Sequence, residues 1–137
     1  MERFGHQPAR DVSILSMNAV ESGNRAAWLA LFTDDAVVQD PIGPSPLDPE
    51  GQGHRGSDAI AAFYDNVISQ GQVRFDVRES YVAGDECANV GTITTTFPDG
   101  TAVAVDVVST YATDGVGRLL ALRAYWEFEA ARVEPAN

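Results

Sequence analysis

The second half of this chain alternates between apolar and polar residues from Gln72 onward, and this pattern limits the possible folds more than any other feature. Period-two alternation is typical of β-strands that bury one face. Three turn signals divide the region: Ala83-Gly84-Asp85, Pro98-Asp99-Gly100 and Asp114-Gly115. We therefore predict an antiparallel meander of strands over residues 72–82, 86–97, 101–113 and 118–130.

The first half has helical spacing instead. Asp11 can cap a helix that Gly23 ends, and Asn24 can cap a short helix over residues 25–32. A strand is expected at residues 36–40, and Ser57 can cap a third helix over residues 58–70. The intervening residues 41–56 are rich in proline and glycine, which favours an irregular loop. Helices followed by strands predict an α+β layer fold, in which helices cross the concave side of a curved sheet.

The length of 137 residues predicts a single domain, residues 1–137, with loose ends at residues 1–9 and 131–137. The apolar runs are shorter than the roughly 18 residues of a membrane span. The N-terminal stretch MERFGHQPARD is polar and lacks the apolar core of a secretory signal. We therefore expect a soluble, cytoplasmic protein.

Composition excludes several classes of partner. Twenty acidic and nine basic residues give a net charge of −11, which repels nucleic-acid phosphates and anionic membranes. Cys87 is the only cysteine, so no intrachain disulfide is possible. His6 and His54 lie far apart, without the spacing of metal ligands, so we expect no metal site. A neutral or weakly polar small molecule is therefore the expected partner.

Asp40 ends an apolar strand and directly precedes Pro41. An acid at this position either caps the loop backbone in solvent or acts as a base held against an apolar wall. Val38 and Trp126 are candidates for that wall, which would raise the basicity of the carboxylate. The residues alone leave both interpretations open.

Two later strands carry further candidates. Alternation places Val107, Ser109 and Tyr111 on one face of their strand and Asp106 on the other. Ser109 either bonds to its own strand or points its hydroxyl into a cavity. In the last strand, one face is expected to carry Leu120, Leu122, Ala124, Trp126 and Phe128. An alanine beside a tryptophan leaves space next to an aromatic wall, although a tryptophan here is also compatible with ordinary core packing.

Three stretches carry a resemblance to a known family. ESGNRAAWLALFTDDAVVQDPIG, GSDAIAAFYD and DGVGRLLALRAYW resemble the bacterial ketosteroid isomerases within the nuclear transport factor 2-like (SnoaL-like) superfamily. The resemblance covers residues 11–128, and the motif D-D-A-x-V-x-D-P-x-G is fairly specific within the superfamily. It implies a cone-shaped α+β fold around one deep apolar pocket, commonly as a homodimer.

The resemblance also implies roles for individual residues. The family's general base falls on Asp40, its supporting tyrosine of the third helix on Tyr64, and a pocket tryptophan on Trp126. The two donors that stabilise the enolate in the family, a tyrosine and a protonated aspartate, fall on Ser16 and Ser109. Serine is a weaker acid than either group, so the chain departs from the family here. The other expected pocket residues are Phe32, Val38, Ile42, Phe63, Val107, Tyr111 and Ala124.

By this resemblance, Asp40 would remove a proton next to the carbonyl of a steroid or similarly hydrophobic ketone and return it to another carbon, which requires no cofactor. Two other functions stay open at this point. One is a cyclase or epoxide-opening enzyme that pairs Asp40 with Asp65, and the other is a non-catalytic binder of apolar ligands. The insertion PSPLDPEGQGH lengthens the loop after Gly43 and could cover the mouth of the pocket.

Overall fold

The computed structural model describes residues 4–136. Two helices open this part of the chain, α1 (Pro8–Glu21) and α2 (Arg25–Leu29), and a third, α3 (Ser57–Asn66), follows the first two strands. Short 3₁₀ turns occupy Ile68–Gln70 and Phe128–Ala130. The strands are β1 (Phe32–Gln39), β2 (His54–Arg55), β3 (Gln72–Ala83), β4 (Glu86–Thr96), β5 (Ala102–Thr113), β6 (Leu119–Tyr125) and β7 (Arg132–Glu134).

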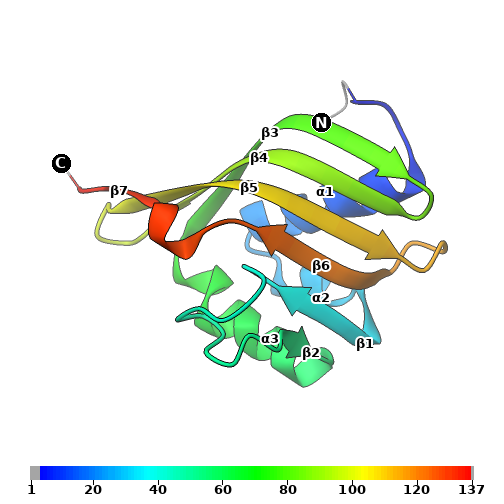
Figure 1. Ribbon diagram of the computed structural model, residues 1–137, viewed down its shortest axis with the longest axis horizontal. Helices are drawn as coiled ribbons and strands as arrows, with labels where there is room; N and C mark the ends of the chain where they lie inside the picture. The colour runs from blue at the N-terminus through cyan, green and yellow to red at the C-terminus, as the bar shows by residue number, and fades with distance from the viewer. Residues whose placement is uncertain (1–3, 137) are drawn as a thin grey trace.

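The strands form one mixed sheet in the order β2-β1-β6-β5-β4-β3, with β7 paired to β5. β3 to β6 form the predicted antiparallel meander, whereas β1 joins β6 in parallel. The sheet is curved and unclosed, and the helices lie on one side of it (Figure 1). α1 packs against β3, β4 and β5, while α3 packs against β1 and β2. The predicted α+β fold is confirmed.

Two irregularities interrupt the regular pairing of the long strands. Val77 pairs with Gly91 but Glu79 pairs with Val90, so Arg78 is an extra residue in β3. Likewise Ala112 and Thr113 of β5 pair with Ala121 and Leu119, which makes Leu120 an extra residue in β6. A β-bulge of this kind bends a strand and increases its twist. Because of this bulge, the expected alternation was wrong for Leu120, which is 43% exposed, while Leu119 is fully buried.

The helix boundaries differ from the prediction for local reasons. α1 begins at Pro8 rather than at Asp11, because proline suits the first turn, where its missing N–H costs nothing. Asn24 caps α2 as predicted, accepting a hydrogen bond from the Ala27 N–H at 3.1 Å. α2 nevertheless stops at Leu29, and Phe32 opens β1 by pairing with Leu119 of β6. Tertiary pairing with β6 therefore decides the conformation of residues that the sequence placed in a helix.

The limits of α3 and of the two chain ends also differ from the prediction. α3 begins at Ser57 with Gly56 at its N-cap position, and it ends at Asn66 before a 3₁₀ turn. The prediction of loose ends was wrong for Pro8 and Ala9, which lie in α1, and for residues 132–134, which form β7. The prediction of loose ends also covers residues 1–3 and 137, which lie outside the described residues. In residues 4–136, no helix is long and apolar enough to cross a membrane.

An aromatic cluster fixes the helices against the sheet. The Trp28 ring meets Phe32 edge to face at a centroid distance of 4.7 Å and packs against Tyr64 at 5.5 Å. All three side chains are buried, as are Val38 and Leu119 next to them. Such aromatic pairs add roughly 0.5–1.5 kcal/mol each beyond their buried area. The cluster closes one end of the layer between helices and sheet.

Candidate active site

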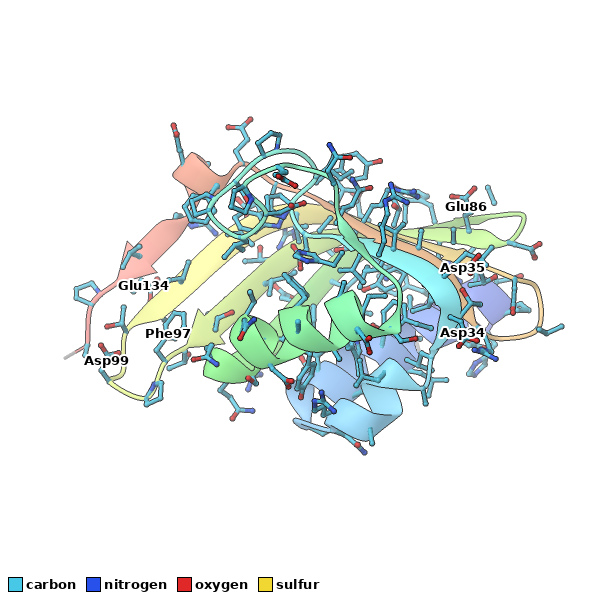
Figure 2. All side chains as sticks on the ribbon, turned by 90° about the horizontal axis from the view of Figure 1, so that it is seen from below. Asp34, Asp35, Glu86, Phe97, Asp99 and Glu134 are labelled. Atoms are coloured by element: carbon cyan, nitrogen blue, oxygen red, sulfur yellow. The ribbon has the colours of Figure 1, made fainter. Side chains whose placement is uncertain are left out.

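A cavity of about 350 Å³ lies between the helices and the concave side of the sheet. This volume is at the small end of the roughly 300–1,000 Å³ of ligand pockets. Its walls are mostly apolar, and Leu47 from the long loop contributes to them. Phe97 also lines the cavity and lies toward the end of the sheet opposite to Asp34 and Asp35 (Figure 2). The polar side chains on its surface are those of Ser16, Trp28, Asp40, Thr95, Ser109, Tyr111 and Trp126.

Asp40 lies directly after β1, on the wall of this cavity. The Trp126 indole N–H donates a hydrogen bond of 2.6 Å to its Oδ1 atom. The neighbouring backbone is held by a 3.1 Å bond from the Ile42 N–H to the Ala124 carbonyl, which ties the loop to β6. Trp126 therefore orients the carboxylate, and the loop that follows Asp40 is tied to β6.

Burial raises the pKa of Asp40 above its ordinary range. The hydrogen bond from Trp126 and the charge of His54 oppose part of that rise, because both favour the ionised carboxylate. A raised carboxyl pKa means a stronger base once the proton has been lost. Asp40 thus has the environment that suits a proton-transfer base rather than a cap in solvent.

A second set of hydrogen-bonding groups lies deeper in the cavity. The Trp28 N–H donates to the Ser16 hydroxyl at 3.1 Å, and both side chains are buried. The Ser16 hydroxyl also faces the phenol of Tyr111 and lowers the pKa of that phenol. Ser109, two residues before Tyr111 on β5, lines the same cavity. The cavity therefore places one carboxylate and several neutral hydroxyl donors around an apolar space.

The structure brings most predicted site residues to this cavity. Those that line it are Ser16, Asp40, Phe63, Ser109, Tyr111, Ala124 and Trp126. Phe32, Val38 and Tyr64 are buried in the core beside Trp28 instead, so their expected places on the cavity wall were wrong. Ile42 is 38% exposed, and Val107 is buried but borders a small void beside Met17. The sequence pattern was right that Phe32, Val38, Tyr64 and Val107 are buried, but it did not show which neighbours they face.

Asp65 does not reach the cavity. It is exposed and forms a two-point ion pair with Arg25, with N···O distances of 2.8 and 3.0 Å. Among the acids of residues 4–136, Asp40 alone lines the cavity. The suggested pairing of Asp40 with Asp65 was therefore wrong. No group of three or more His, Cys, Asp or Glu side chains in this range could hold a metal ion.

Several cavity residues were missed by the sequence reasoning. Alternation on β3, β4 and β5 was the available signal for many of them, since every second residue faces the helices. The missed residues are Val20, Trp28, Leu47, Val67, Ile68, Val73, Phe75, Ile93, Thr95, Phe97, Val103, Val105, Leu122 and Phe128. A larger depression of about 690 Å³ between α1 and β3 is lined by Asp11, Glu21 and Asp76, and Asp40 is not among its lining residues.

The sequence pattern of SnoaL-like domains matches residues 16–131 of the chain. The chain belongs to the SnoaL-like family. The family assignment and the fold confirm the nuclear transport factor 2-like architecture that the resemblance implied.

Three solved structures resemble this SnoaL-like protein over nearly its whole length. The Delta 5-3-ketosteroid isomerase from Mycobacterium sp. is 38% identical with a TM-score of 0.89, covering 94% of this chain and 100% of that one. RV0760c from Mycobacterium tuberculosis, in complex with estradiol-17beta-hemisuccinate, is 32% identical with a TM-score of 0.87, covering 93% and 99%. A computationally designed 17-OHP binder is 30% identical with a TM-score of 0.89, covering 94% and 100%.

The raised pKa of Asp40 has a consequence for the stability of this SnoaL-like protein. Between the ordinary carboxyl pKa of about 4 and the raised value, the folded state keeps a proton that the unfolded state releases. The contribution of the protonated Asp40 to the free energy of unfolding is therefore complete below about pH 4, and it is lost as the pH rises through the pKa of Asp40 in the folded state.

We accordingly expect Asp40→Asn to raise the stability at pH 7, because the neutral amide removes a charge from the apolar wall. The gain should be about 1 kcal/mol, or roughly 4 °C in Tm. Thermal unfolding of both proteins at pH 4 and pH 7 checks this. The difference should be larger at pH 7, and an equal difference at both pH values would contradict the assignment of the raised pKa to Asp40.

Proposed function

We propose that this SnoaL-like protein moves a carbon–carbon double bond within a steroid or a similarly hydrophobic ketone, with Asp40 as the proton-transfer base. The observation that carries the proposal is the position of the Asp40 carboxylate, held by Trp126 on the wall of an apolar cavity. The ketosteroid isomerase at 38% identity supports the reaction class. The estradiol-17beta-hemisuccinate complex and the 17-OHP binder support the ligand class.

The reaction needs no group beyond those of the cavity. Asp40 takes a proton from the carbon next to the ketone, and the electron pair of that C–H bond moves into an enolate. The same carboxylic acid then returns the proton to a different carbon of the conjugated system. Product and substrate have the same composition, so the step requires no oxidant or leaving group. Proton transfer by a positioned side chain contributes roughly 10²–10⁴ in rate.

The apolar walls act on the same step. They keep water from competing for the carboxylate, and they strengthen each hydrogen bond to the enolate oxygen. Phe63, Phe97 and Phe128 supply flat apolar surface for fused rings, and Leu47 brings the loop after Asp40 against the ligand. The long loop therefore belongs to the binding site.

A second candidate function is the binding of steroid-like ligands without turnover. The observation in its favour is that Ser16 and Ser109 occupy the positions where the resemblance places a tyrosine and a protonated aspartate, which are both stronger acids than serine. Loss of one such donor costs roughly 10²–10³ in rate. A protein that kept the cavity but lost enolate stabilisation would bind the ligand and release it unchanged.

The test is an ultraviolet absorbance assay that follows the conversion of an unconjugated to a conjugated 3-ketosteroid by the wild-type protein. We expect conversion that saturates with steroid concentration. The companion measurement is the steroid affinity, from quenching of tryptophan fluorescence. No conversion together with tight binding would contradict the isomerase and favour the binder.

A further inference from the structure

The cavity contains a buried phenol that no part of the proposed reaction has yet used. Tyr111 lies on β5, two residues beyond Ser109, and only 2% of its surface is exposed. Its side chain lines the same cavity as Asp40. Burial, followed by the charge of Asp40, raises the pKa of Tyr111 well above its ordinary value. The phenol is therefore protonated at any working pH, and it shares the lining of one cavity with the Asp40 carboxylate.

The direction of the hydrogen bonds around Tyr111 follows from counting protons. An indole N–H can only donate, so the 3.1 Å bond between Trp28 and Ser16 makes the serine oxygen the acceptor. The hydroxyl proton of Ser16 is then left to point toward the oxygen of Tyr111, which is the direction that lowers the pKa of the phenol. The phenol keeps its own proton, which is free to point into the cavity. Trp28, Ser16 and Tyr111 thus form a chain of donors that ends at the ligand.

Such a chain strengthens its last donor. Each hydrogen bond polarises the next, and in a medium of low dielectric constant the effect is larger than in water. The bond from Ser16 lowers the pKa of the Tyr111 phenol relative to burial alone. Trp28 is 1% exposed and Ser16 is 2% exposed, so water does not compete for either group. In this arrangement Ser16 positions and polarises the phenol.

We propose that Tyr111 is the acidic donor to the enolate oxygen in this protein, in the place of the first-helix tyrosine whose position is occupied by Ser16. This inference rests on the proposed function and names the group that completes its site. The phenol forms a hydrogen bond to the oxygen without giving up its proton, while Asp40 carries the proton taken from carbon. Ser109, on the same face of β5, lies in position to be the second donor.

The electrostatics of the two residues suit this division of work. In the free protein the negative charge on Asp40 disfavours a second negative charge near Tyr111. When Asp40 accepts the substrate proton it becomes neutral, and the new negative charge appears on the enolate oxygen. One negative charge is therefore present throughout, and during the reaction it moves from Asp40 to the enolate oxygen. Tyr111 is therefore most effective at the moment when the enolate exists.

The test compares Tyr111→Phe with Tyr125→Phe, a matched loss of a hydroxyl on the neighbouring strand, where Tyr125 is 52% exposed. We expect Tyr111→Phe to lower kcat by roughly 10²–10³ with a smaller change in KM, and Tyr125→Phe to leave both unchanged. A second readout is independent of turnover: the affinity for estradiol, whose phenol oxygen mimics the enolate oxygen. Tyr111→Phe should weaken estradiol binding by about tenfold, with Tm reported as a check on folding.

A double-mutant cycle tests whether Ser16 acts on the reaction through Tyr111. If Ser16 acts only through the phenol, Ser16→Ala lowers kcat in the wild type but has no further effect in Tyr111→Phe. A merely structural role would lower kcat equally in both backgrounds.

The outcomes separate this inference from the proposed function. A wild type without isomerase activity whose estradiol affinity still depends on Tyr111 would end the proposed reaction and keep Tyr111 as the donor. A folded Tyr111→Phe variant with wild-type kcat and wild-type estradiol affinity would overturn the inference, whatever the activity of Asp40 variants. Failure of both the wild type and Tyr111→Phe to bind estradiol would also overturn the inference about Tyr111.

Discussion

Asp40→Asn should lower the rate of double-bond migration by about 10²- to 10⁴-fold, because the amide cannot accept the substrate proton. The variant keeps the shape of the side chain, and its amide oxygen can still accept the Trp126 hydrogen bond that holds Asp40 at 2.6 Å. The affinity for the steroid should therefore stay within a few-fold of wild type. Parallel ultraviolet assays and fluorescence titrations measure the two quantities.

The matched control is Asp65→Asn, which makes the same change at an exposed acid paired with Arg25. We expect wild-type turnover from this control. Equal losses in both variants would favour chemistry with two acids and contradict a single base. Turnover that survives in Asp40→Asn would place the base elsewhere. Loss of turnover together with loss of steroid binding would indicate damage to the cavity instead of removal of a base.

The pH dependence of kcat tests the same residue from another direction. Since burial raises the pKa of Asp40, the active ionised form appears only as the pH rises above an ordinary carboxyl pKa. The range in which activity increases is the range in which stability falls. The ionisation of one buried carboxylate thus accounts for both the rise of kcat and the fall of stability with increasing pH.

Local patterns predicted the fold well because each strand carries its own signal. β3, β4 and β5 begin and end within one residue of their predicted limits, since glycine-containing turns separate them. The prediction was wrong for the end of β6, which stops at Tyr125 rather than at residue 130 and is followed by a 3₁₀ turn. The parallel pairing of β1 with β6 had no such signal. Leu31 and Phe32 fit an apolar helical stripe, yet the 2.6 Å bond from the Leu119 N–H to the Leu31 carbonyl draws them to the sheet. That bond joins residues far apart in the sequence, so no local pattern could reveal it.

The sequence predicted which face of a strand each site residue occupies, but not which side chains it contacts. The motif located Asp40, and period two located Tyr111 and Ser109 on one face of β5. The chain of hydrogen bonds from Trp28 through Ser16 joins α2, α1 and β5, so it depends on tertiary packing. Tyr64 illustrates the converse. Helical phase identified it as buried, but its ring packs on Trp28 in the core rather than on the cavity.

Gly91 lies where the backbones of β3 and β4 approach each other closely. It is in β4 next to the bulge at Arg78 of β3, and a β-bulge bends its strand. A Cβ atom at Gly91 would overlap the backbone carbonyl oxygen of Asp76 and would lie 2.9 Å from the Cα atom of Val77. These are backbone atoms, which cannot rotate away as a side chain can. Phe75 and Ile93, which pair beside this bend, both line the cavity.

Gly91→Ala should therefore destabilise the protein by about 3 kcal/mol or more, because overpacking against backbone forces the two strands apart. In a domain of this size, that corresponds to a fall in Tm of roughly 10 °C. The matched control is Gly23→Ala, where φ is +68° and nothing lies within 4 Å of the added atom. That variant pays only the strain of a left-handed backbone, about 1 kcal/mol. Equal Tm values for the two variants would show that close approach at the bulge does not limit the residue at position 91, and the bend would then need another cause.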